Sequence, residues 1–210
     1  DVTPRDVVTQ DSADATRNYR LAADQGDVAA QYNLGIMYDN GRGVARDFTE
    51  AIKWYRMAAA QGHVAAQYNL GFMYDNGRGV ARDFTEAVKW YRLAADQGHP
   101  AAQTNLGVMY ANGRGVAQDH GQALRWYRMA AVQGHAAAQT NLGVQYELGR
   151  GVAQDLVQAH VWYAVAAANL PPGEARDRAA RNRNEVARRM TPAQIARAQE
   201  LARDFRPRKE

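Results

Sequence analysis

Residues 27–62 read DVAAQYNLGIMYDNGRGVARDFTEAIKWYRMAAAQG, and residues 63–98 read HVAAQYNLGFMYDNGRGVARDFTEAVKWYRLAADQG. The two stretches differ at only five of 36 positions. The pattern continues with more substitutions in 99–134 and 135–170. A fixed period of this length is typical of a solenoid, in which each unit packs on its neighbours. The functional question is therefore what the surface of the array binds.

The first half of each repeat predicts an amphipathic helix. In the first copy, Ala30, Leu34 and Tyr38 share one stripe at i, i+4 and i+8, which should face a partner helix. Gly35 lies beside that stripe and recurs as Gly71, Gly107 and Gly143. A glycine inside a helix costs about 1 kcal/mol relative to alanine. Its recurrence therefore predicts that another helix approaches closely at this position.

The second half of each repeat predicts a glycine turn and a second helix. Gly41 and Gly43 can adopt the left-handed conformations that a tight connection needs. Asp47 should cap the second helix, and the stretch from Asp47 to Glu50 resembles a capping box. Trp54 lies on the inward stripe between small alanines, which favours close packing of its large side chain against the next helix.

The period breaks at both ends of the chain. Pro171-Pro172-Gly173 ends the fourth repeat, and two further helices are expected near 174–190 and 193–205, the latter started by Thr191 and Pro192. The expected organisation is a tail and capping helix at 1–26, repeats at 27–62, 63–98, 99–134 and 135–170, and capping helices with a basic tail at 171–210.

Composition narrows the classes of partner. There is no cysteine, and no apolar run approaches the roughly 18–20 residues that span a bilayer. Residues 173–210 carry a net charge of +5 and the rest carries −1, so the repeats are not the basic surface expected of a nucleic-acid binder. Because the chain begins at Asp1, we expect a trimmed or signal-processed form, which favours a periplasmic or secreted location over a cytoplasmic one.

The repeat resembles the Sel1-like repeat, a bacterial relative of the tetratricopeptide repeat. The resemblance is carried by Ala30, Leu34, Gly35, Tyr38, Gly41, Gly43, Val44, Asp47, Ala51, Trp54, Ala58, Ala59 and Gly62, and it covers residues 27–170 in four copies. It implies an all-α, right-handed α/α solenoid that serves as an adaptor for proteins or peptides. Some cysteine-rich members are linked to penicillin binding or weak β-lactamase activity, so a cell-wall-ligand or β-lactam-binding role remains the alternative.

The candidate binding site is the concave face that the first helices should line. Its residues are Tyr32, Asn33 and Ile36 with their counterparts Tyr68, Asn69, Phe72, Thr104, Asn105, Val108, Thr140, Asn141 and Val144. The repeated asparagines either pair with an extended peptide backbone or hold neighbouring helices in place, and both interpretations stay open. This position changes from tyrosine in the first two copies to threonine in the last two, which favours a role in specificity.

Chemistry-bearing motifs are sparse. The single serine is Ser12, so there is no serine hydrolase motif, and no metal-binding His-Glu-x-x-His is present. His63, His99 and His135 recur once per repeat, too far apart to share a metal ion, and we interpret them as residues that start helices. We therefore expect no enzyme, no cofactor and no metal. Docking of the basic tail on an acidic partner, a membrane surface or a nucleic acid is a further open possibility.

Overall fold

The computed structural model describes residues 15–205 and 207, and all regular structure in this part of the chain is α-helical. The described chain divides into two compact units between Gln97 and Gly98. The prediction of an all-α solenoid built from helix pairs is confirmed. The predicted tail within 1–14, including Ser12, and the end residues 206 and 208–210 lie outside the described residues.

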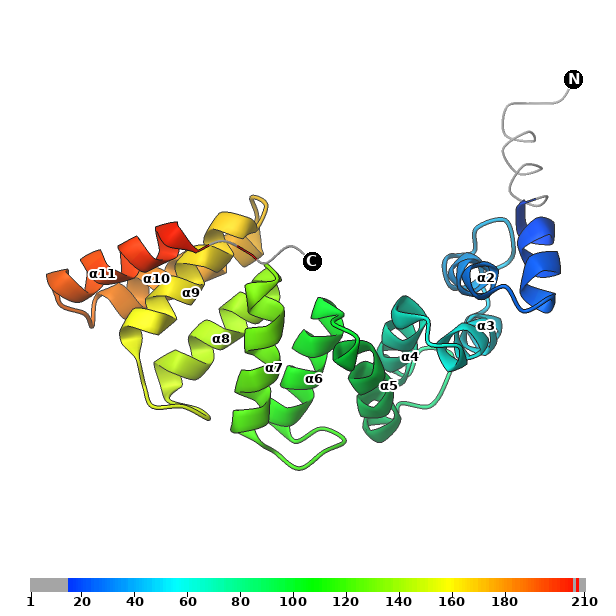
Figure 1. Cartoon of the computed structure of the whole chain (residues 1–210), viewed down its shortest axis with the longest axis horizontal. Coiled ribbons are helices and arrows are strands. Elements are labelled where there is room, and N and C mark those ends of the chain that lie inside the picture. Colours follow the sequence, from blue (N-terminus) through cyan, green and yellow to red (C-terminus); the bar gives the residue numbers. More distant parts are fainter. Residues whose placement is uncertain (1–14, 206, 208–210) are drawn as a thin grey trace, which may run out of the picture. The chain divides into compact units, whose positions relative to one another are not determined.

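Unit 1 consists of a helical segment over residues 15–24 followed by two helix pairs. The pairs are α2 (Val28–Asn40) with α3 (Phe48–Ala60), and α4 (Val64–Asn76) with α5 (Phe84–Asp96). Each first helix packs on its own second helix, and α3 also packs on α4 (Figure 1). Every first helix ends as predicted at a left-handed glycine, such as Gly41 with φ 67°.

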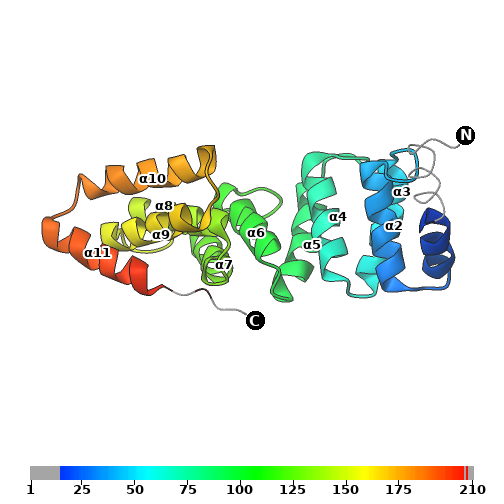
Figure 2. The same ribbon diagram turned by 90° about the horizontal axis from the view of Figure 1, so that it is seen from above.

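Unit 2 contains two more helix pairs and two terminal helices. The pairs are α6 (Pro100–Asn112) with α7 (His120–Val132), and α8 (Ala136–Leu148) with α9 (Leu156–Asn169). They are followed by α10 (Glu174–Ala187) and α11 (Pro192–Asp204), both of which pack on α9 (Figure 2). The two predicted C-terminal helices therefore exist, and Thr191 starts α11 with a complete capping box.

Side chains at the helix starts satisfy backbone N–H groups that have no partner within the helix. Asp47 accepts hydrogen bonds from the N–H groups of Thr49 and Glu50, as predicted. Glu50 pairs with Lys53 at 3.4 Å. His63 starts α4 in the same way, since its Nδ1 accepts from the N–H of Ala66 at 3.2 Å. His99 does so for α6, so two of the three repeated histidines cap helices, as expected.

A ladder of buried glutamines, which the hydrophobic pattern did not predict, connects neighbouring helices. Its members are Gln31, Gln67, Gln103 and Gln139, each at most 4% exposed. Nε2 of Gln67 donates to the carbonyl of Ala59 at 3.2 Å, while its Oε1 accepts from Gln97 at 2.8 Å. A buried polar side chain is tolerated only when it is hydrogen-bonded. Within each unit, Gln67 and Gln139 thus connect the first helix of one pair to the second helix of the pair before it.

Candidate functional site

The twelve candidate residues lie on the first helices α2, α4, α6 and α8, and we call the surface they form the first-helix face. The structure gives these residues different exposure. Phe72 is 38% exposed, whereas Thr104 is only 4% exposed. The other ten are half-buried. Phe72 is therefore the candidate side chain most open to a partner.

The tyrosines of this face also contact aromatic side chains outside the first helices that carry them. The Tyr32 ring stacks on His63 with centroids 4.3 Å apart and tilts against Tyr55 at 5.9 Å. Tyr68 meets Tyr91 with the same 5.9 Å spacing. Each of these tyrosines thus presents only part of its surface, because the rest of the ring is held by neighbouring aromatic side chains.

The threonine that replaces tyrosine in the third repeat keeps a contact with the following histidine. The hydroxyl of Thr104 lies 2.9 Å from Nδ1 of His135 and donates to the carbonyl of Pro100 at 2.8 Å. Burial lowers the pKa of His135, and the nearby His99 lowers it further. The stacked pair in the first repeat is therefore replaced by a hydrogen-bonded pair here, so the change from tyrosine to threonine also alters the frame.

Within unit 1, Asn69 lies next to Tyr55 of the preceding second helix. Burial is the main cause that raises the pKa of Tyr55, and a hydrogen bond from Asn69 acts in the opposite direction. Asn33 lines an open pocket of about 460 Å³ together with Asn18 and Tyr19. The structural interpretation therefore has direct support at Asn69, while Asn33 borders open space.

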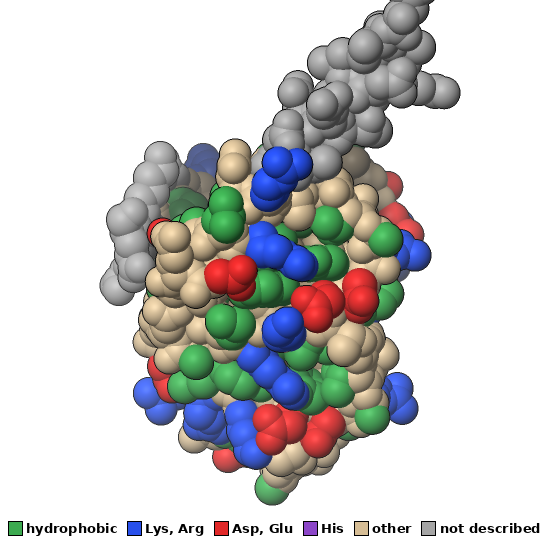
Figure 3. Space-filling model, turned by 90° about the vertical axis from the view of Figure 1, so that its right-hand side faces the viewer, with side chains coloured by type: hydrophobic (Ala, Val, Ile, Leu, Met, Phe, Trp, Pro, Cys, Tyr) green, Lys and Arg blue, Asp and Glu red, His purple; other side chains and the backbone are tan. Residues whose placement is uncertain are grey.

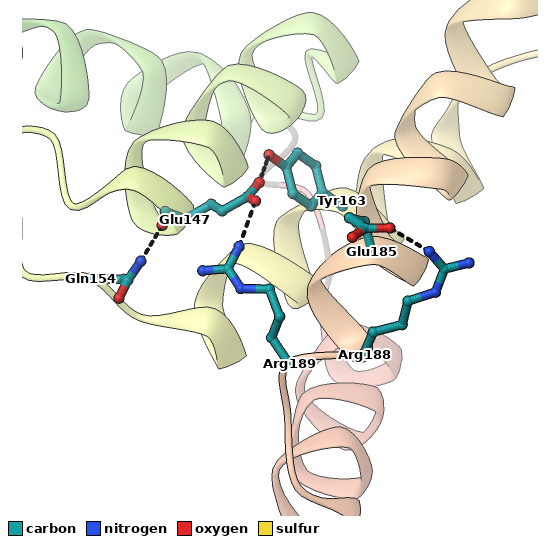
Figure 4. A network of polar contacts seen from close by, with 6 residues as sticks. All are labelled: Glu147, Gln154, Tyr163, Glu185, Arg188 and Arg189. Atoms are coloured by element: carbon teal, nitrogen blue, oxygen red, sulfur yellow. Dashed lines mark hydrogen bonds and ion pairs between the residues drawn. The ribbon is translucent and has the colours of Figure 1, made fainter.

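Carboxylates at the ends of the first helices accept hydrogen bonds from tyrosines of the second helices. The Tyr163 hydroxyl donates to Glu147 at 2.8 Å, and Arg189, in the turn after α10, pairs with the other oxygen of Glu147 at 2.9 Å (Figure 4). Burial, followed by the hydrogen bond to Glu147, raises the pKa of Tyr163. From the sequence, Asp39, Asp75 and Glu147 are interpreted as solvated helix ends or as groups that attract basic residues of a partner, because their contacts with other helices leave no local pattern.

The same arrangement recurs in unit 1. Tyr91 donates to Asp75 at 3.4 Å. Nη2 of Arg78 lies 3.0 Å from Oδ1 of Asp39 and forms an ion pair with it. The geometry of this pair does not meet that of a hydrogen bond to Oδ1. In the third repeat Ala111 occupies the position of the carboxylate. The carboxylates of Asp39, Asp75 and Glu147 therefore contact side chains of other helices. The third repeat, which has Ala111 at this position, is the one exception.

That exception gives a matched test of the tyrosine–carboxylate contact. Replacing Tyr163 by phenylalanine is expected to lower the free energy of unfolding by about 1 kcal/mol, because the hydrogen bond to Glu147 is lost. Tyr127→Phe is the control, since Ala111 offers no carboxylate there, and should change stability by less than about 0.5 kcal/mol. Urea unfolding of both variants measures the difference, and equal losses would show that the carboxylate adds nothing.

Charges of both signs lie interspersed with hydrophobic side chains on the face of the molecule seen in Figure 3.

Within residues 15–205 and 207, no group of three or more His, Cys, Asp or Glu side chains has an arrangement that could hold a metal ion. Among the helices of the same residues, none has the length and hydropathy needed to cross a membrane.

Comparisons with known proteins agree on one family. The Sel1 repeat matches residues 5–27, 28–63, 64–99, 100–135 and 136–169. A Sel1 repeat protein from Oxalobacter formigenes is 32% identical, with a TM-score of 0.75 over 90% of this chain and 76% of that one. A protective antigen with an SLR fold from uropathogenic Escherichia coli is 29% identical, with a TM-score of 0.54 over 92% and 56%.

A more distant likeness is one of fold alone. An immunity protein from Pseudomonas aeruginosa is 22% identical, with a TM-score of 0.51 over 97% of this chain and 84% of that one. Among curated proteins, the comparison found no match. The first Sel1 match, 5–27, overlaps the segment that the sequence predicts as a capping helix.

Proposed function

The chain belongs to the Sel1 repeat family, and we propose that it is a non-catalytic scaffold that binds a protein or peptide on its first-helix face. Proteins of this family are generally protein-interaction scaffolds. The proposed contact residues are the twelve first-helix positions defined above, with those of unit 1 carrying the larger side chains.

The exposed ring of Phe72 is the observation that carries this proposal. Phe72 follows Tyr68 by one helical turn on α4, so the two aromatic side chains are neighbours on the helix surface. Aromatic residues are enriched among the side chains that dominate binding energy at protein interfaces. The corresponding positions of the other repeats hold the smaller, half-buried Ile36, Val108 and Val144.

The asparagines beside these aromatics can supply polar contacts to a peptide. An asparagine amide has two N–H donors and an acceptor oxygen. The bond between Asn69 and Tyr55 therefore leaves part of the amide available. Asn33, which borders open space, has the same groups to offer. A chain laid along this face could thus pair its backbone with amides while its side chains contact Phe72 and Tyr68.

The test selects short peptides from a random display library on the full chain and measures their affinity for variants by fluorescence polarisation. Phe72→Ala should weaken binding at least tenfold, as expected for a central aromatic contact. Leu93→Ala is the matched control, because Leu93 is also a large exposed apolar residue of unit 1, 47% exposed, but lies on the second helix α5.

Binding to Leu93→Ala should stay within about twofold of the original chain, since a surface residue outside an interface contributes little. Equal losses in the two variants, or a larger loss in Leu93→Ala, would contradict the proposal and move the binding surface to the second helices. Phe72 is preferred to Tyr32 for this test because the Tyr32 ring also stacks on His63, so its removal would disturb the frame.

A further inference from the structure

A second surface with unassigned chemistry lies at the C-terminal end of unit 2. Residues of α9, α10 and α11 line an open pocket of about 660 Å³. This volume is in the range that holds small ligands. Helices α10 and α11 follow the last matched Sel1 repeat, which ends at 169, so they are additions to the repeated frame.

The wall of this pocket contains a histidine where the other repeats have an aliphatic residue. Position 160 corresponds to Ile52, Val88 and Leu124 in the preceding copies, and here it is His160. The residue is only 4% exposed, and among the described residues its Nδ1 has no hydrogen-bond partner. Burying a polar atom without a partner costs free energy, so an imidazole at this position needs an explanation.

The guanidinium of Arg183 gives the wall of the pocket a positive charge. Arg183 from α10 and Arg203 from α11 line it, and no acidic side chain is among its described lining residues. The side-chain oxygen of Asn184 accepts hydrogen bonds from Nε and Nη2 of Arg183 at 3.1 and 2.9 Å. These bonds orient the guanidinium of Arg183, and they leave its Nη1 and the second proton of Nη2 available to a ligand.

A neutral His160 can still donate one hydrogen bond, from the ring nitrogen that carries its proton. Burial is the main cause that lowers the pKa of His160, and the charge of Arg183 lowers it further. In the tautomer protonated at Nδ1, this atom is a donor. The rest of the lining includes Ala164, Ile195 and Ala202, which offer an apolar wall beside the charged groups.

We propose that this pocket binds an organic carboxylate that carries a short apolar group. The fork of Arg183 matches the two oxygens of a carboxylate. The imidazole of His160, which lines the same pocket, supplies a further donor, and the apolar wall formed by Ala164, Ile195 and Ala202 receives the rest of the ligand. The carboxylate can come from a free organic acid or from the C-terminus of a peptide, since the recognising chemistry is the same.

Titration of the full chain followed by NMR tests this assignment with N-acetylleucine as the probe. For a ligand of this size we expect saturable binding with a Kd of about 1 mM, and perturbed resonances around His160 and Arg183. N-acetylleucinamide is the matched probe without the charge and should bind at least tenfold more weakly. Inorganic phosphate tests whether charge alone is enough and should also bind more weakly, because it cannot use the apolar wall.

Variants identify the residues that hold the probe. Arg183→Gln and His160→Leu should each weaken binding of N-acetylleucine at least fivefold, while Arg181→Gln, an exposed arginine on the same helix that does not line the pocket, should leave it unchanged. His160→Leu introduces the residue that the third repeat has at this position, so the variant should fold and melt at the original temperature or above.

Three results would overturn the proposal. These are the absence of saturable binding up to about 10 mM, equal affinity for the acid and its amide or for phosphate, and full binding by both Arg183→Gln and His160→Leu. A tetrapeptide ending in leucine distinguishes a peptide C-terminus from a free organic acid as the ligand. Tighter binding than N-acetylleucine, lost on amidation of its C-terminus, assigns the pocket to peptide ends, whereas equal binding assigns it to free acids.

Discussion

Replacement of Gly107 by alanine is expected to lower the free energy of unfolding by about 2 kcal/mol. An alanine Cβ at this position would lie 2.6 Å from Cε1 and 2.7 Å from Cδ1 of Tyr127. Tyr127 is only 3% exposed, so its ring has little room to retreat. Overpacking of a well-filled core costs up to about 3 kcal/mol, and the better helix propensity of alanine returns about 1 kcal/mol.

Gly121→Ala is the control for Gly107→Ala. Gly121 is an exposed helical glycine of α7, in the same unit, and a Cβ there would meet only a side-chain oxygen of Asp119 at 3.2 Å. Thr49 and Thr85 occupy the equivalent position in the first two repeats. This substitution should leave stability unchanged or raise it by up to about 1 kcal/mol.

Urea unfolding followed by circular dichroism measures both changes, with the m-value checked for constancy. A double variant with Tyr127→Leu should lose less than the sum of its single changes, because the clash disappears with the ring. If Gly107→Ala were as stable as Gly121→Ala, the close approach of the two helices would not be the reason for the glycine.

The close approach at Gly107 shows what repetition in a sequence can and cannot reveal. A glycine that recurs inside a helix at a fixed period indicates that something packs against it, and the Tyr127 ring does so. The identity of that neighbour could not be predicted, because a stripe on one helix does not determine the register of the helix that packs against it. The glycine turns and aspartate caps were predictable, since their geometry depends on neighbouring residues in the sequence.

The candidate site was less predictable than the fold. Thr104 and Thr140 occupy the same place in their repeats, yet Thr104 is 4% exposed and Thr140 is half-buried. Their exposure depends on contacts with other helices, such as that between Thr104 and His135, which no local pattern encodes. The position of Arg189 beside Glu147 was equally hidden, because α10 lies outside the repeat and its residues follow no period.

The glutamine ladder carries the second large expected effect. Replacing Gln67 by methionine, which has a similar shape, is expected to lower the free energy of unfolding by about 2 kcal/mol. The change removes a hydrogen bond to the carbonyl of Ala59 and another from Gln97. Gln67 is 4% exposed, so the carbonyl of Ala59 loses a partner in a place that water scarcely reaches. The carbonyl of Ala59 keeps the N–H of Gly62 as a donor at 3.0 Å, so the expected loss is that of the two side-chain hydrogen bonds, about 1 kcal/mol each.

Gln25→Met makes the same chemical change at an exposed glutamine of unit 1 and should shift stability by less than about 0.5 kcal/mol. Gln97→Met should fall between these two, since the side chain of Gln97 is exposed but its partner oxygen on Gln67 is buried. The double variant Gln67→Met/Gln97→Met should lose less than the two single changes together, because the bond between them can be lost only once.

Urea unfolding of the four variants measures these differences, and additivity of Gln67→Met and Gln97→Met would show that the two side chains act independently. A loss at Gln67 no larger than that at Gln25 would mean that the buried amide contributes no net stability. The expected asymmetry follows from burial, because water solvates the exposed side chain of Gln25 but cannot replace the two hydrogen bonds of the buried Gln67. A repeat array that uses a polar ladder in this way sets the spacing of its helix pairs through directional bonds, which apolar packing alone would leave less defined.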